Sequence, residues 1–264
     1  MKEDKLPKNS DLIITVNEIR TILDDYRIGK KPLAKLLGWG ETTIIRYIEG
    51  DVPTTEYSSK LRAIEEEPSY YYELLLKNRD KLTDVAFRKS KKAVLSKLME
   101  SKISLIAHYI VSLCEADVSP VYIQWLLYYS QAFSLALYDK ELIEEDYCVN
   151  HDSIPYVKLY ESMKNRVAGV LEIPEGRLTE QEIAVVDKVV NSFSWYGPKA
   201  IKTLYNEERS NYRISRDKES NRIIAKDTIK NHFREILSQY AIHSLNEINR
   251  YPDKRIIEIK NQLQ

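Results

Sequence analysis

The sequence predicts a mainly α-helical protein with two domains. Apolar residues recur at helical spacing along almost all of the 264 residues, glycine occurs only seven times, and dipeptides typical of β-hairpins are scarce. The chain is longer than a usual single domain, and its hydrophobic content of 43% is ample for a core. We therefore expect a small N-terminal helical bundle, a helical connector and a larger, mostly helical C-terminal domain.

The N-terminal bundle is predicted to span residues 16–67, after a polar arm at residues 1–15. Its first helix covers residues 17–26, and its fourth covers residues 56–66, behind the capping pair Pro53-Thr54. Two shorter helices and a tight turn fill the space between them.

These two short helices, within residues 33–50, are predicted to form a helix-turn-helix. Leu33, Leu36 and Leu37 give the first of them a buried face. Gly38 and Gly40 supply a turn that a residue with a β-carbon would strain. The spacing is that of a DNA-binding module.

The second helix of the motif is predicted to begin at Glu41 and to bury Ile44 with Tyr47 or Ile48. Its outward residues would then meet the major groove of DNA. The residues expected to contact DNA, from this helix and from the segments around it, are Lys31, Glu41, Thr42, Thr43, Arg46, Arg88 and Lys89.

Charge is balanced overall, with 40 basic and 40 acidic residues, so the whole chain has no general attraction to nucleic acid. Residues 15–67 carry eight basic and ten acidic residues, which is unfavourable for DNA binding. Residues 68–102 carry nine basic and four acidic residues, with Arg88 and Lys89 in the densest run. The predicted helical connector, residues 68–100, therefore either supplies phosphate contacts or is only the solvated face of a linking helix.

The C-terminal domain, residues 101–264, is predicted from a series of helix start and stop signals. An apolar helix at residues 103–113 has little polar face and is expected to be buried. Ser119-Pro120 begins a central core helix, and Thr179 with Glu182 forms a capping box. The helices expected after residue 120 span residues 121–138, 180–193, 199–206, 227–240 and 252–262.

This second region resembles the Panacea domain, also called SocA-like. Residues 119–132, with their Leu-Leu-Tyr-Tyr-x-Gln core, are similar to the family's "P-x-K-L-Q-K-L-L-Y-Y-A-Q-G", although Trp125 replaces a lysine. Residues 178–182 match "L-T-x-x-E", and residues 224–233 resemble "I-x-x-x-x-I-x-x-Y-F". The likeness covers residues 101–237 and departs at Val149 to Tyr160, where the family's Trp and Gly-Pro pair are missing.

Residues 37–50 resemble the "L-G-x-G-x-T-T-I-x-R-Y-E-x-G" of MqsA- and Xre-type helix-turn-helix antitoxins, with Ile45 and Ile48 where acidic residues are usual. A helix-turn-helix followed by a Panacea domain implies an antitoxin of a bacterial or phage toxin–antitoxin system. The resemblance implies that the C-terminal domain neutralises a protein toxin encoded by an adjacent gene. It also implies that the N-terminal domain represses the shared promoter, as a homodimer on operator DNA.

Six residues of the C-terminal domain are predicted to contact the partner. They are Trp125, Tyr128, Tyr129, Gln131, Tyr156 and Tyr160. Tyr128 and Tyr129 point about 100° apart on a helix, so one can lie in the core while the other lies at the surface. Core packing is the default interpretation for both tyrosines, and Trp125 is either a core anchor or an exposed hot spot.

No catalytic residue, metal site or cofactor is predicted. Cys148 and His151 are only two ligands, fewer than a structural zinc site needs. His108 lies in an apolar helix without a recognisable nucleophile partner, and we expect it to be a core histidine. The acidic run from Glu141 to Asp146 is expected to be a solvated loop, and no glycine-rich phosphate loop occurs.

Two cysteines and the lack of a signal peptide or of an apolar run of about 18 residues predict a cytoplasmic protein that does not enter the membrane. Two functions remain open. In the first, the chain is an antitoxin that also reads DNA. In the second, it is a phage-type regulator or proteolysis adaptor whose helix-turn-helix binds protein. The net charge of residues 15–67 and the two isoleucines favour the second.

Overall fold

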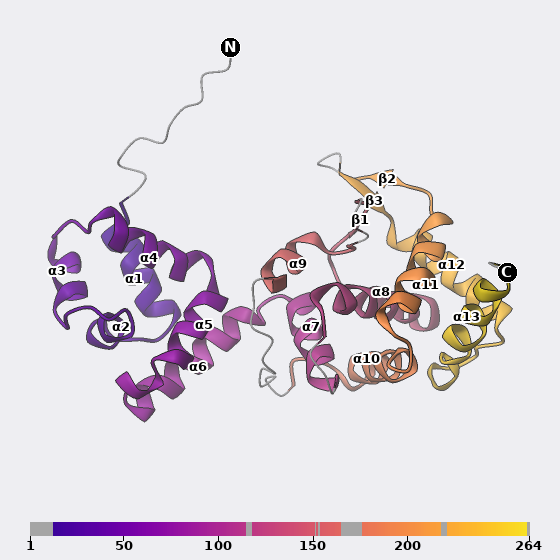
Figure 1. The fold of residues 1–264 in the computed structure, drawn as a ribbon, viewed down its shortest axis with the longest axis horizontal. Coiled ribbons are helices and arrows are strands. Elements are labelled where there is room, and N and C mark those ends of the chain that lie inside the picture. The colour runs from indigo at the N-terminus through magenta and orange to yellow at the C-terminus, as the bar shows by residue number, and fades with distance from the viewer. Residues whose placement is uncertain are drawn as a thin grey trace, which may run out of the picture. The chain divides into compact units, whose positions relative to one another are not determined.

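The computed structural model describes residues 13–114, 118–150, 152, 154–164, 176–217 and 221–262. Thirteen α-helices and one small antiparallel sheet account for most of these described residues, so the protein is mainly α-helical, as predicted (Figure 1). The chain divides into two compact units, here called the N-terminal unit, up to Glu100, and the C-terminal unit, from Ser101.

The N-terminal unit holds the following helices in chain order: α1 (Val16–Asp25), α2 (Lys30–Leu36), α3 (Thr43–Glu49), α4 (Thr55–Glu66), α5 (Pro68–Lys77), the 3₁₀-helix η2 (Arg79–Lys81) and α6 (Asp84–Leu98). Thr15 and Glu18 form a capping box at the start of α1, and Thr54 caps α4.

The segment expected to be a connector is helical, and it packs within the N-terminal unit. Helix α5 lies against α4 and α6, and η2 lies beside α2. The rings of Tyr26 in the α1–α2 loop and Tyr71 in α5 stack at 4.0 Å, and both side chains are fully buried. The Tyr26 hydroxyl donates to the Ile64 carbonyl at 2.8 Å. Helices α5 and α6 therefore complete the core around the helix-turn-helix.

The C-terminal unit holds α7 (Lys102–Leu113), α8 (Pro120–Tyr138), β1 (Tyr147–Cys148), α9 (Val157–Lys164), α10 (Glu180–Phe193), α11 (Pro198–Ser210), β2 (Ser215–Arg216), β3 (Arg222–Ile224), α12 (Lys226–Gln239), the 3₁₀-helix η3 (Leu245–Glu247) and α13 (Arg250–Gln262). The predicted capping box of Thr179 and Glu182 is present at the start of α10, and Ser119 caps α8.

Helix α8 is the centre of this unit, and α7, α9, α10, α11 and α12 all pack against it. Its residues from Tyr122 to Ala136 are all buried. Aromatic rings fill the space around it: Tyr129 stacks on Phe193 of α10 at 4.4 Å, and Phe133 meets Phe233 of α12 edge-on at 5.2 Å. A helix that is apolar on every side must be surrounded by other elements that shield all of its faces from water.

The small sheet has the strand order β1-β3-β2, and both pairs are antiparallel. Tyr147 faces Ile224 across one pair, and Arg216 faces Arg222 across the other. Neither the sheet nor α9 was predicted. Among the described residues no helix combines the length and the apolar character required to cross a bilayer.

Candidate functional site

Helices α2 and α3 pack against each other and form the predicted helix-turn-helix, with α1 also against α3. Leu33 and Leu36 are buried, as expected, whereas Leu37 is half-buried and Ala34 takes its place in the core. Helix α3 begins at Thr43, two residues later than predicted, and Ile44 is its fully buried anchor. Tyr47 and Ile48 are both half-buried.

The two turn glycines differ. Gly38 has φ +73°, the left-handed conformation that the prediction required. Gly40 does not have positive φ, and a Cβ built there would lie 3.5 Å from Thr43 Oγ1, which is ordinary contact. The prediction that both positions need glycine is therefore wrong for Gly40.

We expect Gly38→Ala to lower the free energy of unfolding by about 1–2 kcal/mol, because a β-carbon is strained in the left-handed region. Gly40→Ala is the matched control and should change stability by less than about 0.5 kcal/mol. Urea denaturation of both variants measures the difference. Equal losses for the two alanines would contradict this account of the turn.

The outward surface of the motif carries most of the residues predicted to meet DNA. Lys31, Glu41, Thr42 and Arg46 are exposed, whereas Thr43 is half-buried because it lies in the first turn of α3 against the Gly40 turn. Thr42 occupies the N-cap of α3 but makes no side-chain capping hydrogen bond. The Thr42 hydroxyl therefore takes no part in capping the start of α3.

Ion pairs offset much of the positive charge on this surface. Glu41 lies 2.9 Å from Lys35 and 3.8 Å from Lys31, and the hydrogen bond and charge of Lys35 lower the pKa of Glu41. Arg46 places two guanidinium nitrogens 2.6 and 2.7 Å from one oxygen of Asp51. The Arg46 guanidinium is therefore held by the Asp51 carboxylate at the surface of the motif.

The basic helix α6 belongs to the same unit as the motif. Arg88 and Lys89, which were predicted to contact phosphates, are both exposed on it, and so is Lys92. The preceding helix η2 packs beside α2 and carries the exposed Lys81. A cationic segment thus starts next to the first helix of the motif.

Unlike most of the residues predicted to meet DNA, five of the six residues predicted to bind the partner are buried, within the C-terminal unit. Trp125, Tyr128, Tyr129, Gln131 and Tyr156 are at most 4% exposed, and only Tyr160 is half-buried. Tyr128 and Tyr129 are both in the core, as the default interpretation predicted, and neither reaches the surface, because α10, α11 and α12 enclose α8.

The buried glutamines hold loops in place. Gln131 Oε1 accepts from the backbone N–H groups of Leu142 and Ile143 at 2.8 Å, and its amide donates to the Ile143 carbonyl at 3.0 Å. Gln124 Oε1 accepts from the backbone N–H of Tyr156 at 2.9 Å. The residues that carry the Panacea resemblance thus include ones that build this core.

The structure also locates most of the residues that the sequence analysis considered for catalysis or metal binding. His108 is 5% exposed, within the core as expected. His151 lies outside the described residues, and Cys148 is half-buried. Glu141 is exposed and its carboxylate binds Lys226 at 2.8 Å. Among the described residues no group of three or more His, Cys, Asp or Glu side chains is arranged to hold a metal ion.

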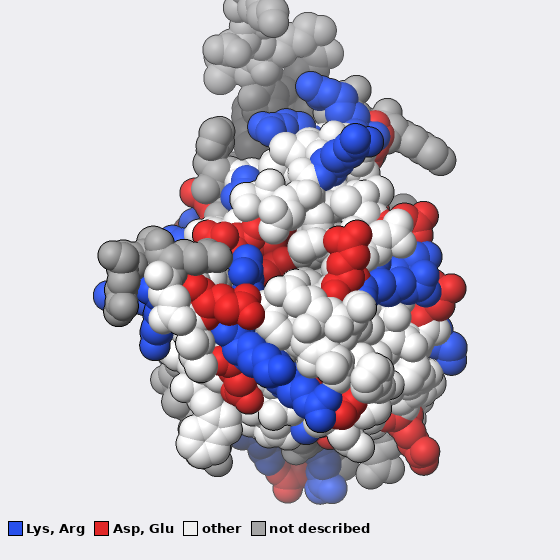
Figure 2. All heavy atoms as spheres, turned by 90° about the vertical axis from the view of Figure 1, so that its right-hand side faces the viewer, with Lys and Arg blue, Asp and Glu red and all other residues white. Residues whose placement is uncertain are grey.

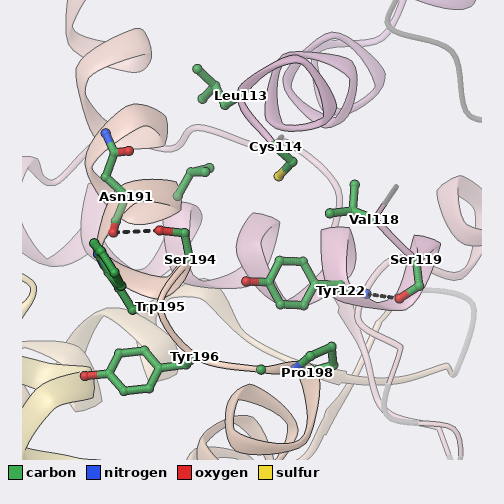
Figure 3. A pocket seen from close by; sticks show the side chains of 12 residues that line it. Leu113, Cys114, Val118, Ser119, Tyr122, Asn191, Ser194, Trp195, Tyr196 and Pro198 are labelled. Carbon is green, nitrogen blue, oxygen red and sulfur yellow. Dashed lines mark hydrogen bonds between the residues drawn. The ribbon is translucent and has the colours of Figure 1, made fainter. Parts of the chain in front are cut away.

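A pocket of about 780 Å³ in the C-terminal unit was not predicted. It lies where the ends of α7 and α10 meet the starts of α8 and α11. Figure 3 shows Tyr122 between Leu113, Cys114 and Val118 on one side and Trp195, Tyr196 and Pro198 on the other. Trp195 is 88% exposed at the edge of the pocket, and none of the described residues that line the pocket is charged.

A polar network was also missed. Glu208 of α11 is 2% exposed, accepts a hydrogen bond from Tyr251 at 2.7 Å, contacts His232 of α12 and lies 3.7 Å from Arg255 of α13. Nearby, Tyr128 bonds to Tyr212 and Tyr147 to Tyr205 through their hydroxyls. Burial raises the pKa of Tyr251 well above its usual value, so its hydroxyl stays protonated and donates to Glu208. The network joins α11, α12 and α13.

Comparisons with family models, curated proteins and solved structures find no match for this chain.

Proposed function

We propose that this chain is a DNA-binding antitoxin: the N-terminal unit reads the operator of its own operon, and the C-terminal unit neutralises a protein toxin from an adjacent gene. The observation that carries the first half is the exposed start of α3, where Thr42 and Arg46 face outward above a buried Ile44. This is the geometry with which a helix-turn-helix contacts base edges.

Helix α6 supports the same half of the proposal. Residues 15–67 carry more acidic than basic residues, and the exposed Arg88, Lys89 and Lys92 supply cations within the same compact unit. Phosphate contacts position a protein on the duplex, and base contacts specify the sequence. We assign α6 the first role and α3 the second.

The toxin half of the proposal is supported by the resemblance of residues 101–237 to Panacea domains. Neutralisation would be by docking, without a chemical step. Because the residues first expected to contact the toxin are mostly buried, the contact falls to exposed side chains of the C-terminal unit.

The alternative function, a regulator or adaptor whose helix-turn-helix binds protein, is favoured by one contact. The ion pair of Arg46 with Asp51 neutralises the cation best placed to read a base. Under this alternative the half-buried Ile45 and Ile48 contribute to a protein interface.

Co-expression tests the toxin half. We expect the product of an adjacent reading frame to arrest growth when expressed alone, to be harmless together with this chain, and to co-purify with it. Deletion of residues 1–100, which removes the whole N-terminal unit, is expected to leave rescue intact. A harmless neighbour, or a toxic one that this chain neither rescues nor binds, would contradict the proposal.

A further inference from the structure

The turn between α10 and α11 presents a tryptophan that the fold leaves almost uncovered. Trp195 is 88% exposed, whereas Trp125 is 4% exposed in the core. Trp39 is half-buried against Tyr57, with the ring centroids 4.2 Å apart. A covered tryptophan side chain buries about 150–250 Å², and tryptophan is among the residues that carry most of the binding energy at protein interfaces. Trp195 is therefore the strongest candidate for a contact with a partner.

Hydrogen bonds hold this turn in one conformation. The backbone N–H of Tyr196 donates to the Phe193 carbonyl at 3.0 Å. The N–H of Ala200 donates to the Gly197 carbonyl at 2.9 Å, where α11 begins. The Tyr196 hydroxyl donates to Asp253 of α13, and Figure 3 shows this ring reaching toward that helix. A turn that is already ordered loses little conformational freedom when a partner binds, which favours affinity.

Two lysines follow the tryptophan within the first two turns of α11. Lys199 and Lys202 are exposed and lie three positions apart, on one face of the helix. Neither forms an ion pair with any residue that the structure describes. Asp253, the acid that contacts this turn, already accepts from the Tyr196 hydroxyl. Like charges at this spacing repel, so a carboxylate placed against both ammonium groups is stabilising.

Charge also distinguishes between the possible partners of this surface. A second copy of the chain would pair the surface with itself about a twofold axis and bring the lysines of the two copies together. A nucleic-acid strand follows a groove of positive charge. Figure 2 shows the end of the C-terminal unit where α12 and α13 lie, and Lys and Arg are there interspersed with Asp and Glu. Because α13 contacts the turn through Asp253, this mixed surface continues to it and favours a protein partner.

We propose that Trp195, Lys199 and Lys202, here called the Trp195 surface, dock an acidic segment of a protein partner. An apolar side chain of the segment packs against the indole, and its carboxylates pair with the two ammonium groups. Where the partner is the toxin, this inference rests on the proposed function and names the exposed side chains that the toxin contacts.

Fluorescence anisotropy of a labelled peptide tests the Trp195 surface in the full chain. The probe is an octapeptide with a central pair of phenylalanines and glutamate at the remaining positions. We expect wild type to bind it at least about tenfold more tightly than a counterpart with lysine in place of glutamate. Trp195→Ala and, separately, Lys199→Glu with Lys202→Glu should each weaken binding about tenfold or more. Trp195→Phe keeps an aromatic ring and should bind within about threefold of wild type.

Matched controls come from α9, which packs against α8. Val157→Ala removes an apolar side chain that is 38% exposed. Lys158→Glu with Lys164→Glu makes the same change of charge at two exposed positions. Both controls should bind the peptide as wild type does, and unchanged circular dichroism shows that each variant is folded.

Acrylamide quenching of tryptophan fluorescence locates the contact. Trp195 is far more exposed than Trp125 or Trp39, so the unlabelled peptide should lower the quenching constant of wild type. In Trp195→Phe the peptide should leave the quenching constant unchanged. An equal decrease in the two proteins would place the peptide elsewhere and overturn the proposal.

Three results of the anisotropy titrations also overturn the proposal: no binding of the glutamate peptide by wild type, equal binding by Trp195→Ala, or equal losses in the two lysine double variants. A labelled oligothymidine supplies a fourth. If wild type binds it more tightly than the peptide, and Trp195→Ala loses that binding, the surface is a site for nucleic acid instead.

Co-purification with the product of the adjacent gene separates this inference from the proposed function. If wild type captures that product and the Trp195→Ala and Lys199→Glu/Lys202→Glu variants capture it equally well, the Trp195 surface fails while the antitoxin proposal stands. If wild type captures nothing, the antitoxin proposal fails, and the peptide titration alone decides the role of the surface.

Discussion

Glu208→Ala is expected to destabilise the C-terminal unit by about 3–5 kcal/mol, because removal of one partner from a buried ionic network leaves the others without compensation. Glu208 is 2% exposed, accepts a hydrogen bond from Tyr251, contacts His232 and forms an ion pair with Arg255 at 3.7 Å. Its loss would leave the Tyr251 hydroxyl, itself fully buried, without the carboxylate it donates to.

Urea denaturation of the full chain, followed by tryptophan fluorescence, measures this effect, since the buried Trp125 reports on the C-terminal unit. Glu207→Ala is the matched control: its side chain is 46% exposed and lies 4.0 Å from Arg255. The control should cost less than about 1 kcal/mol. If Glu208→Ala lowered the free energy of unfolding by less than about 1 kcal/mol, the network would add little to the stability of the C-terminal unit.

Arg46→Ala is expected to weaken binding to DNA from upstream of the gene by about ten- to a hundredfold, the usual value of one base-reading arginine. Folding should be retained, because the Arg46 side chain is 67% exposed and its ion pair with Asp51 lies at the surface.

Asp51→Asn is the informative companion to Arg46→Ala. It keeps the guanidinium and removes the carboxylate that competes with DNA, so affinity should stay equal or rise. Gel shift and anisotropy with both variants measure the two effects. Unchanged affinity in Arg46→Ala would show that Arg46 does not read a base, and would favour the protein-binding alternative.

The parts of the fold that the sequence predicts correctly depend on local chemistry. Thr179 and Glu182 satisfy backbone groups within one helical turn, so the start of α10 follows from the residues themselves. The helix-turn-helix is similar: Leu33, Gly38 and Ile44 each have one role within a short segment, and the structure assigns them those roles.

The errors come from contacts between distant segments. The residue pattern along α8 shows that the helix is apolar. Which of its faces are buried depends on α10, α11 and α12, which follow it by some 40–100 residues. For this reason Tyr128 and Tyr129 are both in the core. The strands hold two or three residues each, too few for a period-two pattern. In the sequence, Glu208 cannot be distinguished from an ordinary helical glutamate, because its burial depends on α12 and α13, which pack against it.

The central claim, that the exposed start of α3 reads an operator, is tested most directly by one titration. The full chain is mixed with a labelled duplex from upstream of its own gene and, separately, with a shuffled duplex of the same composition, at physiological salt. We expect the native sequence to bind at least about a thousandfold more tightly. Equal affinity for the two duplexes, or binding to neither, would contradict the claim.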